Sequence, residues 1–434
     1  MTTVLTEAAC LAARATKEGD MTSLRVKQLH LENFRCFESL DLALEDDLTV
    51  LFAENGGGKT ALLTALAMGL AVVQRGAPRS LKLNPSSDPR QRTLDEQGRR
   101  EPAGPCTVSW AAASGAGPAT EWSTTVNPAS GRTTKKHRSI LEAMEQIRVP
   151  GDRWPLFAWY GVDRMQRCQV KRRAQEATRD RWEAYASSLD PALSDAPLLQ
   201  WLQDEMLGDV VRQRQGEPER FFDKAVMEAT VRATPGVVNA WYDPVEQSPM
   251  VRFETGHVTP WSELSDGYHV FIALVADIAR RAVILNEIDG AEAPARVEGV
   301  VLIDEIDLHL HPRWQRVALH GLREAFPRLQ LVVSTHSPQV LSSAENRQVR
   351  RLIDGKLLAE GLFVEGRDSN AILRDHMMTD DRDEEGTRAL RDLHDAIDHG
   401  DREKAGRLYA ELVARWGDTD PALIRAKGFM DWEE

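Results

Sequence analysis

The chain has 434 residues, of which 42% are hydrophobic and 28% are charged, as in an ordinary globular protein rather than a disordered or fibrous one. Its length exceeds the usual size of one domain, which predicts a large core with insertions or a core with an appended module. The formal net charge of −13 argues against non-specific binding of nucleic acid by the whole surface, although a local basic groove is compatible with it.

The sequence lacks the pattern of a membrane segment or a signal peptide. The longest nearly apolar run, residues 61–73, is too short to span a bilayer. The first 20 residues lack a basic start, and Glu7 stands where a signal peptide would be apolar. The four cysteines form neither a close pair nor a metal-ligand spacing; they are Cys10, Cys36, Cys106 and Cys168. We expect a cytoplasmic protein whose residues 1–23 form a mobile extension; the alternative is that translation starts at Met21, immediately before the first predicted strand.

The first predicted elements surround a glycine-rich loop. Residues 24–53 have the patterns of strands, and a helix is expected from Lys59. Residues 75–150 are rich in Pro, Gly, Ser and Thr, with short strand candidates at 106–112 and 121–126. We interpret this segment as an insertion in a nucleotide-binding core.

The middle of the chain predicts a further core strand followed by a helical lid. The apolar residues 154–161 resemble a core strand, and the polar residues at about 165–235 have apolar positions at helical spacing. Heptads do not continue over several turns there, so a long coiled-coil arm is not expected.

The second half of the core alternates helices with strands. We expect a helix from Trp261 to Ile284, strands at 299–305 and 329–337, and a helix between these two strands. This alternation predicts a largely parallel sheet. The predicted fold class is therefore α/β, a P-loop core of mixed sheet type at residues 24–345.

Residues 346–434 predict a separate module of one strand and small helices. Two apolar stripes at helical spacing end at Gly400 and Gly417, and Asp420 with Pro421 is a helix-start signal. These helices are compatible with two roles, recruiting a partner or simple packing against the core.

The glycine-rich loop is the strongest functional signal. Backbone N–H groups of consecutive glycines and a helix N-terminus attract phosphate, Lys59 would reach the β- and γ-phosphates, and Thr60 would ligate Mg²⁺. Ala53 stands where the usual motif has its first glycine, which requires a negative φ at that residue. The predicted ATP contacts are Ala53, Glu54, Asn55, Gly56, Gly57, Gly58, Lys59, Thr60 and Ala61.

The second signal is an aliphatic strand that ends in two acids. Asp304 would hold Mg²⁺, and Glu305 would orient or deprotonate the attacking water. An acid pair at a strand end also occurs as a helix cap or a solvated turn, so this interpretation depends on the upstream loop. His309 and His311 lack nearby further ligands, and we interpret them as part of a turn rather than as a metal site.

Two further motifs lie in the expected order. A polar turn at residues 264–268 opens a long apolar helix; alone it predicts only an N-terminal cap. Between the other motifs it is similar to the ABC signature loop, LSGGQ, and the predicted contacts are Ser265, Asp266 and Gly267. His336 takes the place of the ABC switch histidine, although a lone histidine is more often structural.

Together these motifs resemble the RecF/SMC/OLD branch of ABC-type ATPases. More narrowly, the chain is similar to the compact bacterial AAA-type ATPases of Septu and retron-linked antiphage systems, over nearly all of residues 24–432. The resemblance is specific for fold and nucleotide and less so for biological role.

The resemblance implies a site shared between two copies of the chain. ATP would be sandwiched between the phosphate loop of one head and Ser265 and Gly267 of the other. Asp307 would lie at the dimer seam, and Arg35 would lie near the adenine or the phosphates. Gln166 is the nearest candidate for the family's Q-loop glutamine, but its match is poor.

Three functions follow as alternatives. The leading hypothesis is an ATP-driven clamp or switch made by a homodimer, with DNA binding left open. An OLD-type nuclease would need a Toprim module with clustered acids on strands after His336, whereas the chain ends in amphipathic helices. A binding platform would use those helices to recruit an effector such as an HNH-type nuclease, as in the systems that the chain resembles. A membrane-coupling segment is not evident, which argues against transport.

Overall fold

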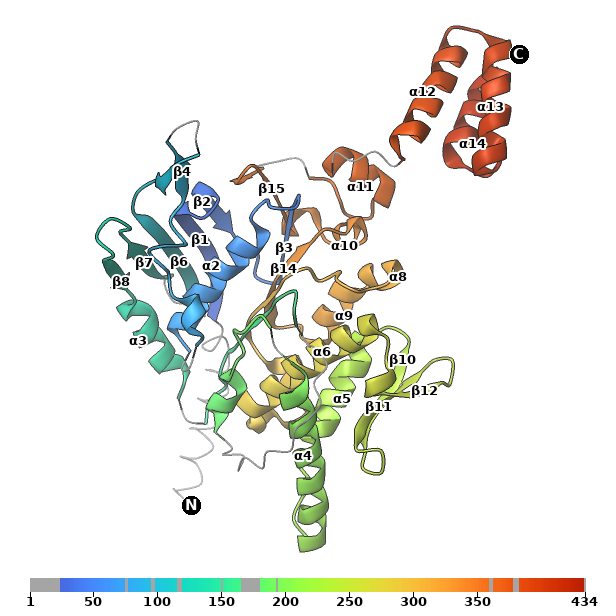
Figure 1. The fold of residues 1–434 in the computed structure, drawn as a ribbon. Helices are drawn as coiled ribbons and strands as arrows, with labels where there is room; N and C mark the ends of the chain where they lie inside the picture. Colours follow the sequence, from blue (N-terminus) through green and yellow to red (C-terminus); the bar gives the residue numbers. More distant parts are fainter. Residues whose placement is uncertain are drawn as a thin grey trace, which may run out of the picture. The chain divides into compact units, whose positions relative to one another are not determined.

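The computed structural model places the described residues in two compact units, Met1–Gly366 and Arg367–Glu434 (Figure 1). The described residues are 24–74, 77–94, 98–114, 119–149, 151–164, 180–192, 194–358, 362–377 and 382–432. The expected extension at 1–23, Cys10, Cys168 and Gln166 lie outside the described residues.

The first unit is built around a six-stranded sheet of order β16-β15-β3-β14-β13-β9. Its strands, in chain order, are β3 (Leu48–Ala53), β9 (Leu156–Tyr160), β13 (Gly299–Ile303), β14 (Leu329–Thr335), β15 (Val349–Ile353) and β16 (Lys356–Leu357). All neighbours pair in parallel except β16, which runs antiparallel to β15. Every residue of β3, β9, β13 and β14 is buried, as expected for parallel strands covered on both faces. The α/β fold with a mixed sheet is confirmed.

Helices flank this sheet. Those of the core are α2 (Lys59–Val72), α6 (Asp266–Leu285), α7 (Ala293–Arg296), α8 (Pro312–Gln315), α9 (Ala318–Ala325) and α10 (Pro338–Ser342). Helix α2 contacts β3, β13 and β14, and it also contacts a strand of a second sheet. Because α2 is enclosed by two sheets, it has no polar face and 11 of its 14 residues are buried.

The second sheet has five antiparallel strands in the order β2-β1-β6-β7-β8. They are β1 (Leu24–Phe34), β2 (Phe37–Ala43), β6 (Cys106–Ser114), β7 (Thr120–Val126) and β8 (Thr133–Lys136). Residues 75–150, expected to be an insertion, supply three of these strands, and β6 pairs directly with β1. The Trp110 indole of β6 donates to the Ala65 carbonyl of α2 at 2.9 Å, which joins this sheet to the core. The segment is thus built into the core through long-range pairing that local composition does not reveal.

The region expected to form a helical lid contains helices and a small sheet. It has α4 (Ala196–Gln215) and α5 (Phe222–Ala233), followed by β10 (Val237–Asp243), β11 (Ser248–Phe253) and β12 (Val258–Pro260). Helix α5 packs against α6 and α9. The shorter elements of the first unit are η1 (Arg79–Leu81), β4 (Gln91–Thr93), β5 (Arg100–Pro102), α3 (Arg138–Ile147), η2 (Arg181–Tyr185), η3 (Trp261–Glu263), η4 (Glu287–Glu292) and η5 (Asn346–Gln348). Residues 165–179 of the expected lid lie outside the described residues.

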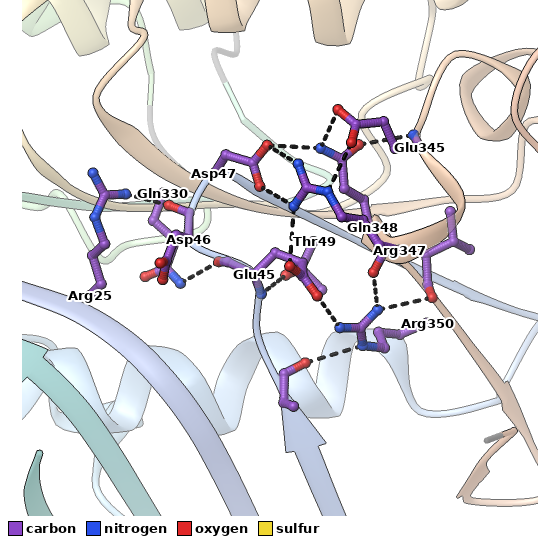
Figure 2. Close-up of polar contacts among 12 residues, drawn as sticks. Arg25, Glu45, Asp46, Asp47, Thr49, Gln330, Glu345, Arg347, Gln348 and Arg350 are labelled. Atoms are coloured by element: carbon purple, nitrogen blue, oxygen red, sulfur yellow. Dashed lines mark hydrogen bonds and ion pairs between the residues drawn. The ribbon is translucent and has the colours of Figure 1, made fainter. Parts of the chain in front are cut away.

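A network of charged side chains joins β3 to β15 at the amino ends of the two strands (Figure 2). Asp47 accepts hydrogen bonds from Arg347 at 2.9 Å and from Gln348 at 2.9 Å, and Glu45 accepts one from Arg350 at 2.7 Å. These contacts fix β15 beside the strand that leads into the phosphate loop. The core sheet therefore extends beyond residue 345, where the sequence predicted the core to end.

The second unit is helical. It consists of α11 (Ser369–His376), α12 (Glu384–Asp398), α13 (Arg402–Trp416) and α14 (Pro421–Trp432). The apolar stripes of the last three helices form one small core of Leu393, Ala396, Ile397, Ala405, Leu412, Leu423 and Ala426. Arg382 and Asp420 pair at 2.6 Å across this unit. The three helices predicted from the stripes and from Asp420-Pro421 are confirmed.

Within the described part of the chain, none of the helices combines the length and the apolar character that crossing a membrane would require.

Candidate functional site

The glycine-rich loop connects the end of β3 to the start of α2, which is the geometry of a phosphate-binding loop. Gly56 and Gly58 have φ of +80° and +96°. A Cβ on Gly58 would lie 2.5 Å from Cζ of Phe37 and 2.8 Å from Sγ of Cys36, so only glycine fits there. The turn between β1 and β2 thus packs directly on the phosphate loop.

Ala53, at the first position of the loop motif, is compatible with this geometry. It is the last residue of β3, has strand conformation and is 1% exposed. A Cβ on Gly57 would come within 2.7 Å of the Ala53 Cβ, so the alanine methyl fills space that Gly57 leaves open. The negative φ required by the sequence argument is present, because Ala53 is not among the residues with positive φ.

The Lys59 ammonium lies among acceptors at the centre of the loop. Its Nζ donates to the carbonyls of Ala53 at 2.9 Å and Glu54 at 3.3 Å, and it lies 2.6 Å from Nε2 of His336. An ammonium group only donates, so Nε2 must accept and His336 must be neutral. Burial and the Lys59 charge both lower the pKa of His336, which agrees with a neutral imidazole. Burial also lowers the pKa of Lys59, against the nearby carboxylates of Glu305 and Asp304.

The two predicted acids follow β13 beside this lysine. Asp304 is 2% exposed, and its Oδ2 accepts a hydrogen bond from Thr60 Oγ1 at 2.7 Å. Its Oδ1 accepts one from the hydroxyl of Ser334, which itself accepts from the Glu305 N–H at 2.8 Å. Thr60 and Asp304 therefore present converging oxygens, the ligand type that Mg²⁺ prefers.

Glu305 has an unusual backbone conformation and a more open carboxylate. Its φ is +46°, a left-handed value that costs a residue other than glycine about 1–3 kcal/mol. Its Oε1 lies 4.0 Å from Nε2 of His336, and its side chain is 35% exposed. Asp307, two residues on, accepts a hydrogen bond from Thr335 Oγ1 at 2.6 Å, which ties the acid turn to the segment preceding the histidine.

The signature-like turn opens α6 and packs against the turn that follows the acids. Ser265 is exposed at the N-cap, and its side chain makes no capping hydrogen bond. A Cβ on Gly267 would lie 2.4 Å from the His309 carbonyl oxygen. The Tyr268 ring meets the Trp314 ring edge-on, with centroids 4.0 Å apart. Asp266 is also exposed.

Arg35 and His311 occupy structural positions. Arg35 pairs with the buried Asp88 at 3.1 Å, and its Nη1 lies 3.4 Å from Thr64 Oγ1 on α2. His311 is the N-cap of α8, where its Nδ1 accepts from the Arg313 N–H at 3.3 Å. This cap agrees with the interpretation of the paired histidines as part of a turn.

Comparisons with known proteins agree with this geometry. Residues 152–342 match the family described as "AAA domain, putative AbiEii toxin, Type IV TA system", and residues 28–215 match a family described as "AAA domain". The chain is 25% identical to "Retron Ec83 probable ATPase" of Escherichia coli over 97% of this chain and 90% of that protein. The two AAA-domain matches together span residues 28–342, and with the similarity to named probable ATPases they indicate an ATPase.

Shorter matches are to proteins named for two systems. The chain is 52% identical to "Retron Vc95 probable ATPase" of Vibrio cholerae serotype O1 biovar El Tor over 20% of this chain and 16% of that protein. It is 44% identical to "Septu protein PtuA" of Bacillus mycoides over 22% of this chain and 11% of that protein. These two matches thus span a small part of each relative. The fold is also similar to a solved SMC head bound to the C-terminal winged helix domain of ScpA, with a TM-score of 0.46, 14% identity, and coverage of 78% of this chain and 98% of that one.

The structure brings the predicted lysine, threonine, acids and switch histidine of the ATPase together. Sequence reasoning missed two residues that hold this arrangement. Ser334 lies in the Ser-Thr-His-Ser segment but was given no role, although its hydroxyl contacts both acids. Arg164, which contacts the carbonyls of both acids, follows a core strand and belongs to no motif that would have revealed it.

Proposed function

We propose that this ATPase binds Mg²⁺–ATP on its phosphate loop and hydrolyses it at Glu305. The observation that carries the proposal is the constellation around Lys59. The Thr60 hydroxyl bonds the Asp304 carboxylate at 2.7 Å, Lys59 reaches His336 at 2.6 Å, and His336 lies 4.0 Å from Glu305. These groups meet because they lie at the ends of β3, β13 and β14 and at the N-terminus of α2.

Each residue has a role suited to its chemistry. Loop N–H groups and Lys59 would bind the phosphates, and Thr60 and Asp304 would hold Mg²⁺, which would supply positive charge to the phosphates. Glu305 orients the attacking water and accepts its proton. Once Lys59 turns to the nucleotide, Nε2 of the neutral His336 is free of the ammonium, and the tautomer protonated at Nε2 would donate to the γ-phosphate. Arg35, although paired with Asp88, stays a proposed contact for the adenine or the phosphates.

We propose further that two copies associate on ATP through the signature-like turn. Ser265 is exposed at the N-terminus of a 20-residue helix, and its hydroxyl makes no capping hydrogen bond. The partial positive charge of this helix N-terminus favours the binding of an anion there. Ser265, Asp266 and Gly267 of one copy would then face the phosphates held by its partner, with Asp307 at the seam. ATP binding would join the heads, and hydrolysis would separate them.

Two variants test hydrolysis and association together. Glu305→Gln should lower the rate of phosphate release by about 10²–10⁴-fold, because it removes the proton acceptor. The same variant should elute as a dimer in ATP, while Lys59→Ala should fail to bind a fluorescent ATP analogue. Hydrolysis by Glu305→Gln at the wild-type rate would overturn the assignment of the base. Monomeric Glu305→Gln in saturating ATP would overturn the dimer.

The biological role that we propose is antiphage defence with an effector partner. Relatives of the chain are named as retron ATPases and as a Septu protein, which supports this setting. In the C-terminal unit, α14 exposes Ile424 by 55% and Phe429 by 61%, which suits a docking helix for an effector such as an HNH-type nuclease. Co-purification with the product of the adjacent gene, lost when the chain is cut after Arg382, would support this role, and retention after the cut would contradict it.

A nuclease activity of the chain itself has less support. Of the described strands after His336, β15 and β16 contain no acidic residue. Asp383, Glu384 and Glu385 lie at the start of α12 rather than on strands. Metal-dependent cleavage of DNA by the purified chain would revive this alternative.

A further inference from the structure

Arg164 connects the strand beside the acids to the acids themselves. It lies in a short turn after β9 and is 4% exposed. Its Nη1 donates to the carbonyl of Asp304 at 2.6 Å, and its Nη2 donates to the carbonyl of Glu305 at 2.8 Å. One buried guanidinium thus spans the two consecutive peptide groups that carry the predicted metal ligand and the predicted base.

The turn that carries Arg164 is itself held firmly. A Cβ on Gly161 would lie 2.5 Å from Cβ of Pro191, and the Gly161 N–H donates to the Pro191 carbonyl at 3.0 Å. The Gly161 carbonyl accepts from Nη1 of Arg164 at 3.0 Å. Tyr160, just before, accepts the Asp304 N–H at 2.8 Å. Arg164 therefore contacts the acid turn from a turn that is itself held by packing and hydrogen bonds.

The acid turn is the part of the site that needs such support. Glu305 has a φ of +46°, and residues other than glycine keep such a conformation only where their surroundings impose it. Three hydrogen bonds hold the Glu305 main chain here. Its N–H donates to Ser334 Oγ at 2.8 Å on one side, and on the other its carbonyl accepts from Arg164 Nη2 at 2.8 Å and from the Leu308 N–H at 3.0 Å.

The acceptors of Arg164 show what kind of support it gives. The hydrogen bonds go to main-chain carbonyls, not to the carboxylates of the acids. If the only role of this position were to neutralise the carboxylates of the acids, a positive charge nearby would be enough, and a lysine could supply it. A planar fork with several donors is required to hold two carbonyls at once.

We propose that Arg164 is a positioning residue for hydrolysis: it fixes the left-handed turn at Glu305, so that the carboxylate faces the phosphate loop. This inference rests on the proposed role of Glu305 as the base. It assigns no contact between Arg164 and the nucleotide, so it concerns the rate of the chemical step and not the binding of ATP.

The test uses Arg164→Lys, which keeps the charge but loses the fork. We expect kcat for ATP hydrolysis to fall by about 10–100-fold, because small misplacements of a catalytic group cost about this much. The Kd for a fluorescent ATP analogue with Mg²⁺ should change by less than about threefold. Arg181→Lys is the matched control, because Arg181 also bridges two carbonyls at 2.6 Å, those of Leu285 and Asp152, away from the site. Arg181→Lys should change neither kcat nor the Kd for the ATP analogue.

A double variant separates positioning from a general loss of structure. If Arg164 acts through Glu305, Arg164→Lys should lower kcat no further in a Glu305→Gln background, because the group being positioned is already gone. Multiplied losses in the double variant would overturn the proposal. An equal fall of kcat and ATP affinity in Arg164→Lys, or a variant that does not fold by its thermal transition, would show a structural role and would also overturn it.

The outcomes keep this inference separate from the proposed function. If Glu305→Gln hydrolyses ATP as the wild type does, the assignment of the base fails. If Glu305→Gln is inactive while Arg164→Lys keeps the wild-type kcat, the assignment of the base stands and only the positioning role of Arg164 fails.

Discussion

The packing of Ala53 against Gly57 gives a quantitative prediction for the phosphate loop. A Cβ on Gly57 would lie 2.7 Å from the Ala53 Cβ and 3.1 Å from the Glu54 carbonyl oxygen. Non-bonded carbon atoms prefer about 3.5–4.0 Å. Gly57 does not have a positive φ, so the cost of Gly57→Ala comes from this overlap rather than from strain. We expect about 1–3 kcal/mol of destabilisation and weaker ATP binding, because the loop N–H groups shift.

Ala53→Gly should relieve much of this cost. Alone, it removes one buried methyl group, worth about 0.8 kcal/mol, and adds backbone freedom worth about 0.5–1 kcal/mol. In the double variant Ala53→Gly/Gly57→Ala the overlap of methyl groups is gone, although the 3.1 Å approach to Glu54 remains. We therefore expect the double variant to be more stable than the sum of the single changes by about 0.5–2 kcal/mol, less than the full cost of Gly57→Ala.

We would measure this coupling by urea unfolding of four proteins: the wild type, both single variants and the double variant. Binding of a fluorescent ATP analogue would report whether the loop still binds nucleotide. Gly56→Ala is the control. Its φ of +80° strains an alanine, but a Cβ there meets nothing within 4 Å, so Ala53→Gly should not rescue it. Additive losses in Ala53→Gly/Gly57→Ala, or equal rescue of Gly56→Ala, would refute the packing argument.

Three further predictions concern polar contacts that are buried or partly buried. Ser334→Ala leaves both acids short of a hydrogen bond, so unfolding free energy should fall by about 1–3 kcal/mol, with slower phosphate release. Asp277→Asn should cost about 3–5 kcal/mol in thermal unfolding, because Arg280 and Arg281 lose a buried partner. Burial opposes ionisation of Asp277, but the two arginines hold its pKa well below the usual range. The contribution of ionised Asp277 to the unfolding free energy should therefore be constant above about pH 5 and shrink only as the pH falls below about 4. If wild type and Asp277→Asn were equally stable at pH 7, this argument would be contradicted. Arg382→Ala should speed hydrogen exchange in α14 by about tenfold, since it removes the pair with Asp420, whereas unchanged exchange would count against that pair.

The local parts of the site could be predicted because their chemistry is contiguous in the chain. A buried strand, a glycine-rich loop and an apolar helix occupy adjacent residues, and their order alone indicates a phosphate site around Lys59. The same holds for the aliphatic strand that delivers Asp304 and Glu305. In the C-terminal unit, the helix boundaries followed from Gly400, Gly417 and Asp420-Pro421, because capping depends on the nearest residues.

Long-range pairing explains what was missed in the fold. The segment 75–150 lacks a strong pattern of its own, yet β6 pairs along the length of β1, which lies far earlier in the chain. The pairing buries Trp110 against α2, and this gain in packing, not local propensity, decides that the segment joins the core. The strand β15 likewise joins the core through its parallel pairing with β3.

Residue types and their spacing predicted the chemistry: a phosphate loop, an acid pair, a signature-like turn and a switch histidine, each a short run of residues whose types limit what they can bind. The three-dimensional packing of the chain was needed to show how these runs meet. It brought Thr60 to Asp304 and His336 to Lys59, and it showed that Arg164 and Ser334 hold the strained turn at Glu305. Hydrogen bonds between residues far apart in the chain depend on the packing of whole elements, and one sequence read locally does not contain that information.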